Sequence, residues 1–178
     1  PCFVFINNSQ NEVTYSLPFL ENMFKFTINS VSYLQKFTLK GVGQFDGSTL
    51  EFIDTGDLDS VHLVDQEGKP LMGTEDDFTL YLEQNGQDSL KNKCVYISRG
   101  GLKFNTKLQN AEANGAKFVI IYTTEGREAV NMGGVDSITI GSHLIEYKDF
   151  TDNVLPLFNN GEDVTTRCAN DYYIVAPV

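Results

Sequence analysis

The sequence is short of basic residues and has no long apolar run. It contains 13 lysine and arginine residues against 24 aspartate and glutamate residues, for a net charge of −11. A nucleic-acid partner is excluded, because phosphate binding needs a basic footprint. A membrane span needs roughly 18 or more consecutive apolar residues, and no run approaches that length. The composition therefore predicts no direct membrane insertion by this chain.

Histidine is also scarce, with only His62 and His143 in 178 residues. Neither lies in a recognisable catalytic motif. Ser142 precedes His143, but a triad needs a nucleophile and a base that meet through space beside an orienting third group. Walker A, G-x-S-x-G and H-E-x-x-H motifs are absent. The sequence therefore predicts a chain that is not an enzyme and that carries no cofactor.

Cysteine is limited to Cys2, Cys94 and Cys168, whose spacing matches no metal site. Cys2 and Cys168 lie near the two ends of the chain, and domain termini are often close in space. We predict a disulfide between these two residues, which fits an oxidising compartment. Cys94 lies in an apolar run and is expected to be a buried thiol.

The N-terminal region bears on the compartment as well. The chain begins at Pro1 without a methionine or a leader pattern, which indicates a processed chain or a piece of a larger protein. Asn7 begins the sequon N-N-S, a predicted glycosylation site in a secreted or lumenal protein. A chance match to the sequon is an equally open interpretation.

The acidic residues are concentrated in one stretch. Between Asp46 and Asp88 there are twelve acidic residues and one basic residue. Asp54, Asp57 and Asp59 could supply oxygen ligands to calcium, but their spacing does not match an EF-hand loop, and no metal site is predicted. A solvated acidic loop and a patch for a basic partner both remain open.

Residues 93–123 form the pattern around which the chain is organised. Cys94–Ile97 is a short strand-forming run, and the two glycines of the turn that follows allow a positive φ. Phe104, Leu108 and Ala111 then lie on one face of a helix, which should end at Gly115. Phe118–Tyr122 is an uninterrupted apolar run, typical of a strand buried on both faces. The pattern predicts a right-handed βαβ unit with parallel strands.

The remaining elements are predicted from shorter runs in a single domain, with a core over residues 78–178 and an all-β N-terminal elaboration over residues 1–77. Residues 78–82 fit either an alternating strand or a short helix. A long glycine-bearing loop after Tyr122 lies at the carboxyl end of a buried strand, where ligands bind in open α/β sheets. The other predicted elements are strands at residues 3–6, 14–20, 24–28, 33–39, 50–53, 61–64, 138–140, 164–166 and 172–175, and a helix at residues 144–157.

One motif resembles a known family. The pattern R-G-G-x-x-F-x-x-K-x-x-x-A-x-x-x-G-A, followed by an apolar strand, is similar to the core of the protease-associated (PA) domain; its positions here are Arg99, Gly100, Gly101, Phe104, Lys107, Ala111, Gly115 and Ala116. A second block, residues 136–149, resembles PA ectodomains of transmembrane ubiquitin ligases. Leu102 stands where the family often has cysteine, so a disulfide through that position is not expected. The resemblance implies a mixed α/β fold, with a curled mixed sheet or open barrel and two principal helices.

The resemblance also implies a function and a site. In PA domains of plant vacuolar sorting receptors, the corresponding turn contributes to the binding of cargo peptides. We therefore expect a peptide site at the turn after the first strand of the βαβ unit and at the loop after its second strand, residues 125–134. The expected contact residues are Arg99, Gly100, Gly101, Leu102, Glu125, Gly126, Arg127 and Met132. A local structural role for Arg99 is the alternative interpretation of the turn.

Three functional hypotheses follow. The first is a non-catalytic module that recognises a protein or peptide in the secretory pathway or the extracellular space. The second is a PA insert of a secreted subtilisin-like protease or aminopeptidase that modulates substrate access. The third is a stand-alone secreted binding protein. The sequence of the full precursor would separate them.

Overall fold

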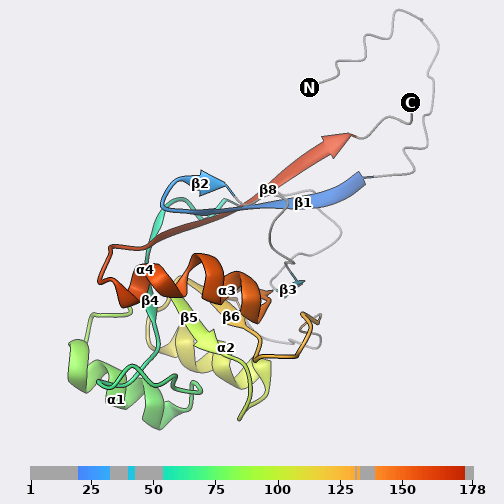
Figure 1. Ribbon diagram of the computed structural model, residues 1–178. Coiled ribbons are helices and arrows are strands. Elements are labelled where there is room, and N and C mark those ends of the chain that lie inside the picture. The colour runs from blue at the N-terminus through green and yellow to red at the C-terminus, as the bar shows by residue number, and fades with distance from the viewer. Residues whose placement is uncertain (1–19, 33–39, 43–53, 131, 133–138, 175–178) are drawn as a thin grey trace, which may run out of the picture.

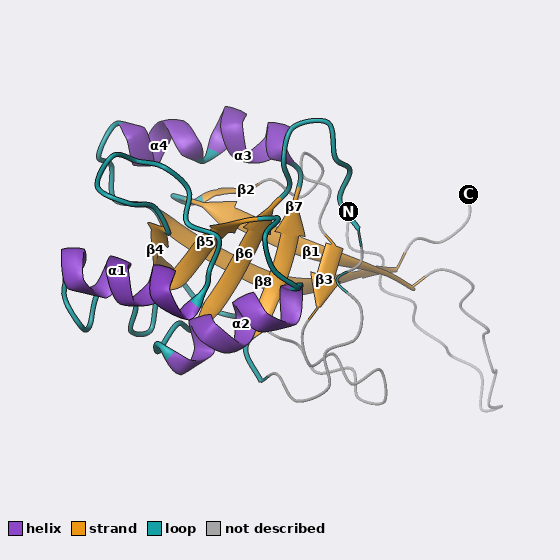
Figure 2. Ribbon diagram, turned by 90° about the horizontal axis from the view of Figure 1, so that it is seen from below, coloured by secondary structure: helices purple, strands orange, loops and turns teal. Residues whose placement is uncertain are grey.

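The computed structural model describes residues 20–32, 40–42, 54–130, 132 and 139–174 (Figure 1). Its centre is a curled, half-barrel mixed sheet of eight strands in the order β2-β1-β8-β4-β5-β6-β7-β3. Figure 2 shows α1 and α2 on one face of this sheet and α3 and α4 on the other. The predicted mixed α/β class with a curled sheet is confirmed.

The middle of the sheet is parallel. It consists of β4 (Leu58–His62), β5 (Cys94–Ser98), β6 (Phe118–Tyr122) and β7 (Gly141–Ile145), each hydrogen-bonded to the next. Every residue of β5 and β6 is buried, and for β6 this agrees with the burial on both faces that its uninterrupted apolar run predicted. Helix α2 (Phe104–Ala113) connects these two strands, so the predicted βαβ unit is confirmed. The helix is followed by Gly115 at φ +85°, as predicted.

Antiparallel strands complete the sheet. β1 (Leu20–Ile28) pairs with β8 (Thr165–Ile174) over nine residue pairs, and Figure 1 shows the two as a long ribbon. Short strands β2 (Val31–Ser32) and β3 (Lys40–Val42) form the two edges. The two strands predicted at 164–166 and 172–175 are wrong as separate elements, because residues 165–166 and 172–174 belong to the single strand β8. Long-range pairing with β1 makes this strand continuous, which a local pattern does not reveal.

Residues 78–82, for which the sequence allowed either a strand or a short helix, lie in helix α1 (Glu75–Asn85). Thr74 caps the helix by accepting a hydrogen bond from the Asp77 backbone N–H (3.0 Å), and the Asp77 carboxylate accepts one from the Thr74 N–H (3.0 Å). This reciprocal capping box satisfies two N–H groups that the helix start would leave without partners. The box favours a helix over a strand.

The helix predicted at residues 144–157 has a different start and is divided in two. Leu144 and Ile145 are the last residues of β7, and α3 (Tyr147–Asn153) begins after them. A second helix, α4 (Leu155–Asn159), follows Val154 and carries Pro156 in its first turn. Proline has no N–H to donate, so it is tolerated at a helix start but interrupts a continuous helix. The structure therefore describes four helices in the residues it covers, where two principal helices were expected.

Two hydrophobic clusters lie on opposite faces of the sheet. Val95 and Ile97 of β5 enter the cluster beneath α1 and α2, whereas Cys94 and Tyr96 enter the cluster beneath α3 and α4. The same alternation holds along β6, because successive strand residues point to opposite faces. Each parallel strand thus joins both cores and leaves only its ends for function.

Several predictions fall on residues outside those that the structure describes. These include Cys2, Asn7 and the strands predicted at 3–6, 33–39 and 50–53. Cys168 is a buried thiol, 4% exposed, in the same cluster as Cys94. The Cys2–Cys168 disulfide and the glycosylation of Asn7 therefore stay predictions. Burial raises the pKa of the Cys94 thiol to about 12, so this thiol is expected to be unreactive.

In the part of the chain that the structure describes, none of the helices has the length and apolarity that crossing a membrane requires.

Thr74→Ala should lower the free energy of unfolding by about 0.5–2 kcal/mol, because it removes the side-chain half of the α1 capping box. Thr79→Ala is the matched control: it removes the same atoms from an exposed position inside the same helix, where the hydroxyl bonds only to the Glu75 carbonyl. Urea unfolding of both variants checks the prediction. Equal midpoints for the two variants would show that the cap contributes nothing.

Candidate functional site

The carboxyl ends of the four parallel strands meet at one edge of the sheet. The turn 99–102 follows β5, the loop 123–130 follows β6, and Glu146 leads from β7 into α3. The chain after β6 passes to the α2 face, where Met132 and Ile140 are buried, whereas the chain after β7 passes to the opposite face as α3. Adjacent strands whose connections leave to opposite faces open a crevice between them, which is where open α/β sheets bind ligands.

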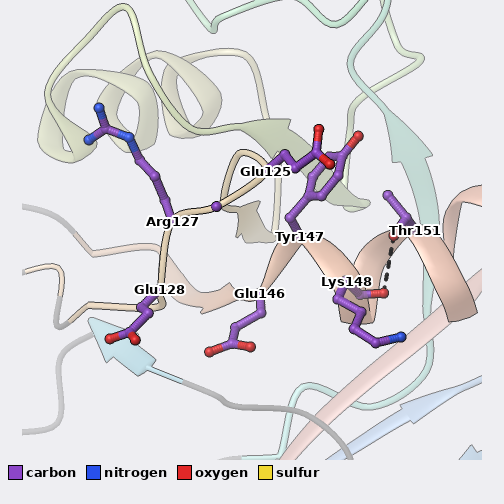
Figure 3. A pocket seen from close by; sticks show the side chains of 8 residues that line it. Glu125, Arg127, Glu128, Glu146, Tyr147, Lys148 and Thr151 are labelled. Carbon is purple, nitrogen blue, oxygen red and sulfur yellow. Dashed lines mark hydrogen bonds between the residues drawn. The ribbon is translucent and has the colours of Figure 1, made fainter.

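A hollow of about 520 Å³ occupies this crevice (Figure 3). One wall is the loop after β6, and the other is the start of α3. The lining residues are Glu125, Gly126, Arg127, Glu128, Glu146, Tyr147, Lys148 and Thr151. The volume lies within the range of small-ligand pockets, about 300–1,000 Å³, and suits one or two side chains of a peptide.

Thr123 joins the two walls at the base of the hollow. Its side chain is buried, its N–H donates to the Ile145 carbonyl (3.0 Å), and its Oγ1 accepts from the Tyr147 N–H (2.8 Å). Above this junction the loop reverses through Gly126 at φ +74°, and the Arg127 N–H donates to the Thr124 carbonyl (3.0 Å). A glycine suits this conformation because an L side chain there is strained. Two backbone hydrogen bonds and one to the Thr123 hydroxyl therefore fix the shape of the hollow.

The turn after β5 lies beside the loop, as the sequence predicted for two parallel neighbours. The Arg99 N–H donates to the Tyr122 carbonyl (2.9 Å), and Arg99 Nη1 donates to the Glu128 carbonyl (3.2 Å). The guanidinium carbon also lies 5.5 Å from the centre of the Phe104 ring. Arg99 thus ties the turn to the loop, and its remaining N–H groups can still donate to a ligand.

The other predicted site residues are placed as follows. Gly100 and Gly101 are exposed, with φ of +107° and +73°, and Leu102 is half-buried. Leu102 lines a second hollow, of about 330 Å³, against the first turn of α1. Met132 is fully buried in the cluster beneath α1 and α2, so its side chain faces the core in this structure. Residues 131 and 133–134 of the predicted loop lie outside the described residues.

Charges of both signs line the hollow. Glu125, Glu128 and Glu146 come from its two walls, and no ion pair is seen for them among the described residues. Lys148 pairs with Asp152, one turn further along α3. Arg127 is exposed, and Figure 3 shows its side chain pointing away from Glu128 and Glu146. Arg127 is the guanidinium on the rim that is open to a partner.

An aromatic cluster beneath α3 and α4 includes one of the two histidines. Half-buried His62 contacts the Tyr122 hydroxyl through Nε2 (2.7 Å), and the Tyr122 ring stacks on Phe150 at 3.8 Å. Burial lowers the pKa of His62 to about 4 and raises the pKa of Tyr122. These groups are packed as core rather than presented to a substrate.

Ser142 and His143 are adjacent in β7 and are 1% and 2% exposed. Neighbouring strand residues point to opposite faces of a sheet, so the hydroxyl and the imidazole are directed apart. Among the residues that the structure covers, no group of three or more His, Cys, Asp or Glu side chains is arranged to hold a metal ion. Asp54, one of the possible calcium ligands, forms an ion pair with Arg167.

The second wall of the hollow was missed in the sequence. The residues concerned are Glu146, Tyr147, Lys148 and Thr151. They were assigned to the interior of a helix beginning at Leu144, which moved them away from the strand end. The available signal was the buried run before them: a strand that ends at Ile145 places the next residues at the ligand-binding edge.

Comparisons with known proteins agree with this architecture. The sequence model of the PA domain matches residues 60–152. BSAP, a zinc aminopeptidase from Bacillus subtilis, superposes with a TM-score of 0.51 at 19% identity, over 87% of this chain and 32% of that chain. The subtilisin-like protease Apa1 from Pseudoalteromonas sp. AS-11 superposes with a TM-score of 0.50 at 14% identity, over 87% of this chain and 35% of that one.

At these identities the structural matches show the fold alone. The chain spans about a third of the length of the solved structures it matches. No curated protein matches the chain in sequence.

Proposed function

This chain belongs to the PA domain family, and from that premise we propose that it is a non-catalytic module that binds an extended protein or peptide segment in the secretory pathway or extracellular space. The observation that carries the proposal is the hollow between the loop after β6 and the start of α3, with the turn 99–102 beside it. The hollow lies at a strand-end crevice, it is open to solvent, and its walls offer backbone, charged and aromatic groups.

The lining groups suit a peptide that carries an acidic residue next to an apolar one. Arg127, with the remaining donors of Arg99, offers planar guanidinium groups for a carboxylate. Tyr147 is half-buried and offers the face of its ring to an apolar side chain. The carboxylates of Glu125, Glu128 and Glu146 repel a second acidic group, so charge selects the register of the peptide.

The alternative function is that of a PA insert in a larger secreted protease, where it modulates substrate access. Its support is that the matched solved structures are an aminopeptidase and a subtilisin-like protease, of which this chain corresponds to about a third. The two functions share the same site and differ in what is joined to it. A precursor sequence with a flanking protease domain would favour the insert.

The test is a screen of a random peptide library against the purified chain, followed by backbone chemical-shift mapping with a selected peptide. We expect shifts at residues 99–102, 125–128 and 146–151. Arg127→Ala should weaken binding about 10- to 150-fold, which corresponds to the loss of a hydrogen bond to a charged group, about 1.5–3 kcal/mol. The peptides should be recovered intact.

Lys117→Ala is the matched control, because Lys117 is exposed at the opposite end of β6 and should leave binding unchanged. Shifts clustered around Lys117, or normal binding by Arg127→Ala, would contradict the proposed site. Cleaved peptides would contradict the non-catalytic function.

A further inference from the structure

A fully buried lysine lies directly behind the turn 99–102. Lys107, in the second turn of α2, is 0% exposed. Its Nζ donates to the Ser98 carbonyl (2.8 Å) and to the Met72 carbonyl. The Ser98 carbonyl is the last group of β5 before the turn, and the Met72 carbonyl belongs to the segment that leads into α1. One side-chain nitrogen therefore joins three parts of the chain at the candidate site.

Side chains from both α1 and α2 form hydrogen bonds with the segment 72–74 that Lys107 binds. Asp77 Oδ2 accepts from the Met72 N–H (2.9 Å) and the Thr74 N–H (3.0 Å). Asn110, one helical turn after Lys107 in α2, donates from Nδ2 to the Gly73 carbonyl (2.9 Å). Amide and carbonyl groups of the segment are thus satisfied by two different helices, which makes it a fixed support.

The turn 99–102 packs directly against the segment 72–74. A Cβ atom placed on Gly101 would lie 3.2 Å from Met72 Cγ, and Gly101 has a φ of +73°. Both the contact and the conformation call for glycine at this position. The turn is therefore bounded by Met72 on one side and, through the Ser98 carbonyl, by Lys107 behind it.

We infer that Lys107 is a positioning residue that fixes the turn 99–102 against the α1 start and so shapes the edge at which the peptide is proposed to bind. The binding part of this inference rests on the proposed function, whereas the effect on the turn does not. An apolar side chain would fill the same space without desolvating an amine, which is costly in a protein interior. Only a donor at this point can satisfy both carbonyls at once.

The electrostatics agree with a role as a donor. Burial lowers the pKa of Lys107 to about 8, and the nearby Asp77 carboxylate acts in the opposite direction. A neutral amine keeps two N–H groups, one for each carbonyl, so both hydrogen bonds survive loss of the proton.

The experiment compares Lys107→Met with Val154→Ala by amide hydrogen exchange and by binding. Methionine keeps the length of the side chain and removes the donors. Val154 is fully buried beneath α3 and α4, so its truncation destabilises the domain away from the turn. We expect exchange at 99–102 and 72–74 to accelerate at least tenfold more in Lys107→Met than in Val154→Ala. Binding of the library-selected peptide should fall about tenfold in Lys107→Met only.

The outcomes separate this inference from the proposed function. Equal exchange at the two segments in both variants would overturn the role of Lys107. A library that yields no binder would contradict the proposed function, while exchange would still decide the effect on the turn. If Lys107→Met fails to fold, ¹⁵N relaxation of the unaltered protein decides: order parameters near 0.85 at 99–102 are expected, and values below about 0.6 would overturn the inference.

Discussion

Leu108→Ala should lower the free energy of unfolding by about 2–5 kcal/mol. Leu108 is 0% exposed in α2 and packs in the cluster beneath α1 and α2. Truncation removes buried methyl groups and leaves a cavity, because the surrounding sheet and helices relax only partly. Since small domains are stabilised by about 5–15 kcal/mol in total, a loss of this size is a large fraction. Urea unfolding monitored by circular dichroism measures it.

Gln109→Ala is the control for this prediction. Gln109 is the next residue of α2 and is exposed, so the same helix loses a side chain without opening a cavity. A surface change of this kind is expected to stay within about 0.5 kcal/mol. Similar midpoints for Leu108→Ala and Gln109→Ala would mean that this face of α2 is not core.

The strand–helix–strand unit could be predicted because its signals are local. Uninterrupted apolar runs mark β5 and β6, and a face with helical spacing marks α2. The turn 99–102 and the loop after β6 could also be placed together, because the carboxyl ends of parallel strands share one edge. The contact between Arg99 and the Glu128 carbonyl agrees with that expectation.

The elements that were missed depend on partners far along the chain. The single strand β8 exists because nine of its residues pair with β1, more than 130 positions earlier in the sequence. The boundary between β7 and α3 depends on pairing with β6, without which Leu144 and Ile145 also fit a helix. Tertiary pairing overrides local propensity in both cases.

The function of Lys107 could not be predicted from the sequence for a different reason. It appeared in the sequence as one position of a family motif, and a lysine is expected at the surface. Its function as a donor to two carbonyls appears only when α2, β5 and the α1 start are in place. Arg99, Gly101 and Lys107 of the motif then share one explanation, because each contributes to the position of the turn.

The turn that the family motif forms and the hollow both lie at the same edge of the sheet, and the motif supports the groups that line the hollow. Arg99 and Lys107 bind carbonyls on either side of the turn, which leaves Arg127 and the start of α3 as the exposed groups. A family motif that fixes a support can stay constant while the exposed layer changes with the partner. Substitutions at Arg127 or Tyr147 are therefore expected to alter which peptide binds, and substitutions at Lys107 to weaken binding of any peptide.

Lowering the pH from about 6.5 to about 4 should destabilise the domain through its two histidines. Burial lowers the pKa of both His62 and His143 to about 4, from an ordinary value of 6.5. In this interval the unfolded chain binds a proton at each histidine and the folded chain does not, so stability falls as the pH falls. Each shift corresponds to roughly 3 kcal/mol, and above pH 6.5 the contribution is constant.

Carboxylates titrate in the same interval, so the histidine part is isolated by variants. Glutamine has similar polar groups and does not titrate, and the double variant His62→Gln/His143→Gln should lose the histidine part of the slope between pH 6.5 and 4. The measurement is the free energy of unfolding of both proteins across that range. The difference between them should change by at most roughly 6 kcal/mol, the sum of the two shifts.

The ring proton resonances of the unaltered protein give a test that needs no variant. His62 packs among the rings of Tyr122, Phe150 and Phe158, and His143 packs near Phe118. The two histidines therefore lie in different environments, so their ring proton resonances can be followed separately. Both histidines should remain neutral in the folded state down to about pH 4. Titration of either ring near pH 6.5 in the folded protein would contradict its burial. Because the expected loss is comparable to the total stability of a small domain, the folded fraction itself should fall before either folded-state pKa is reached.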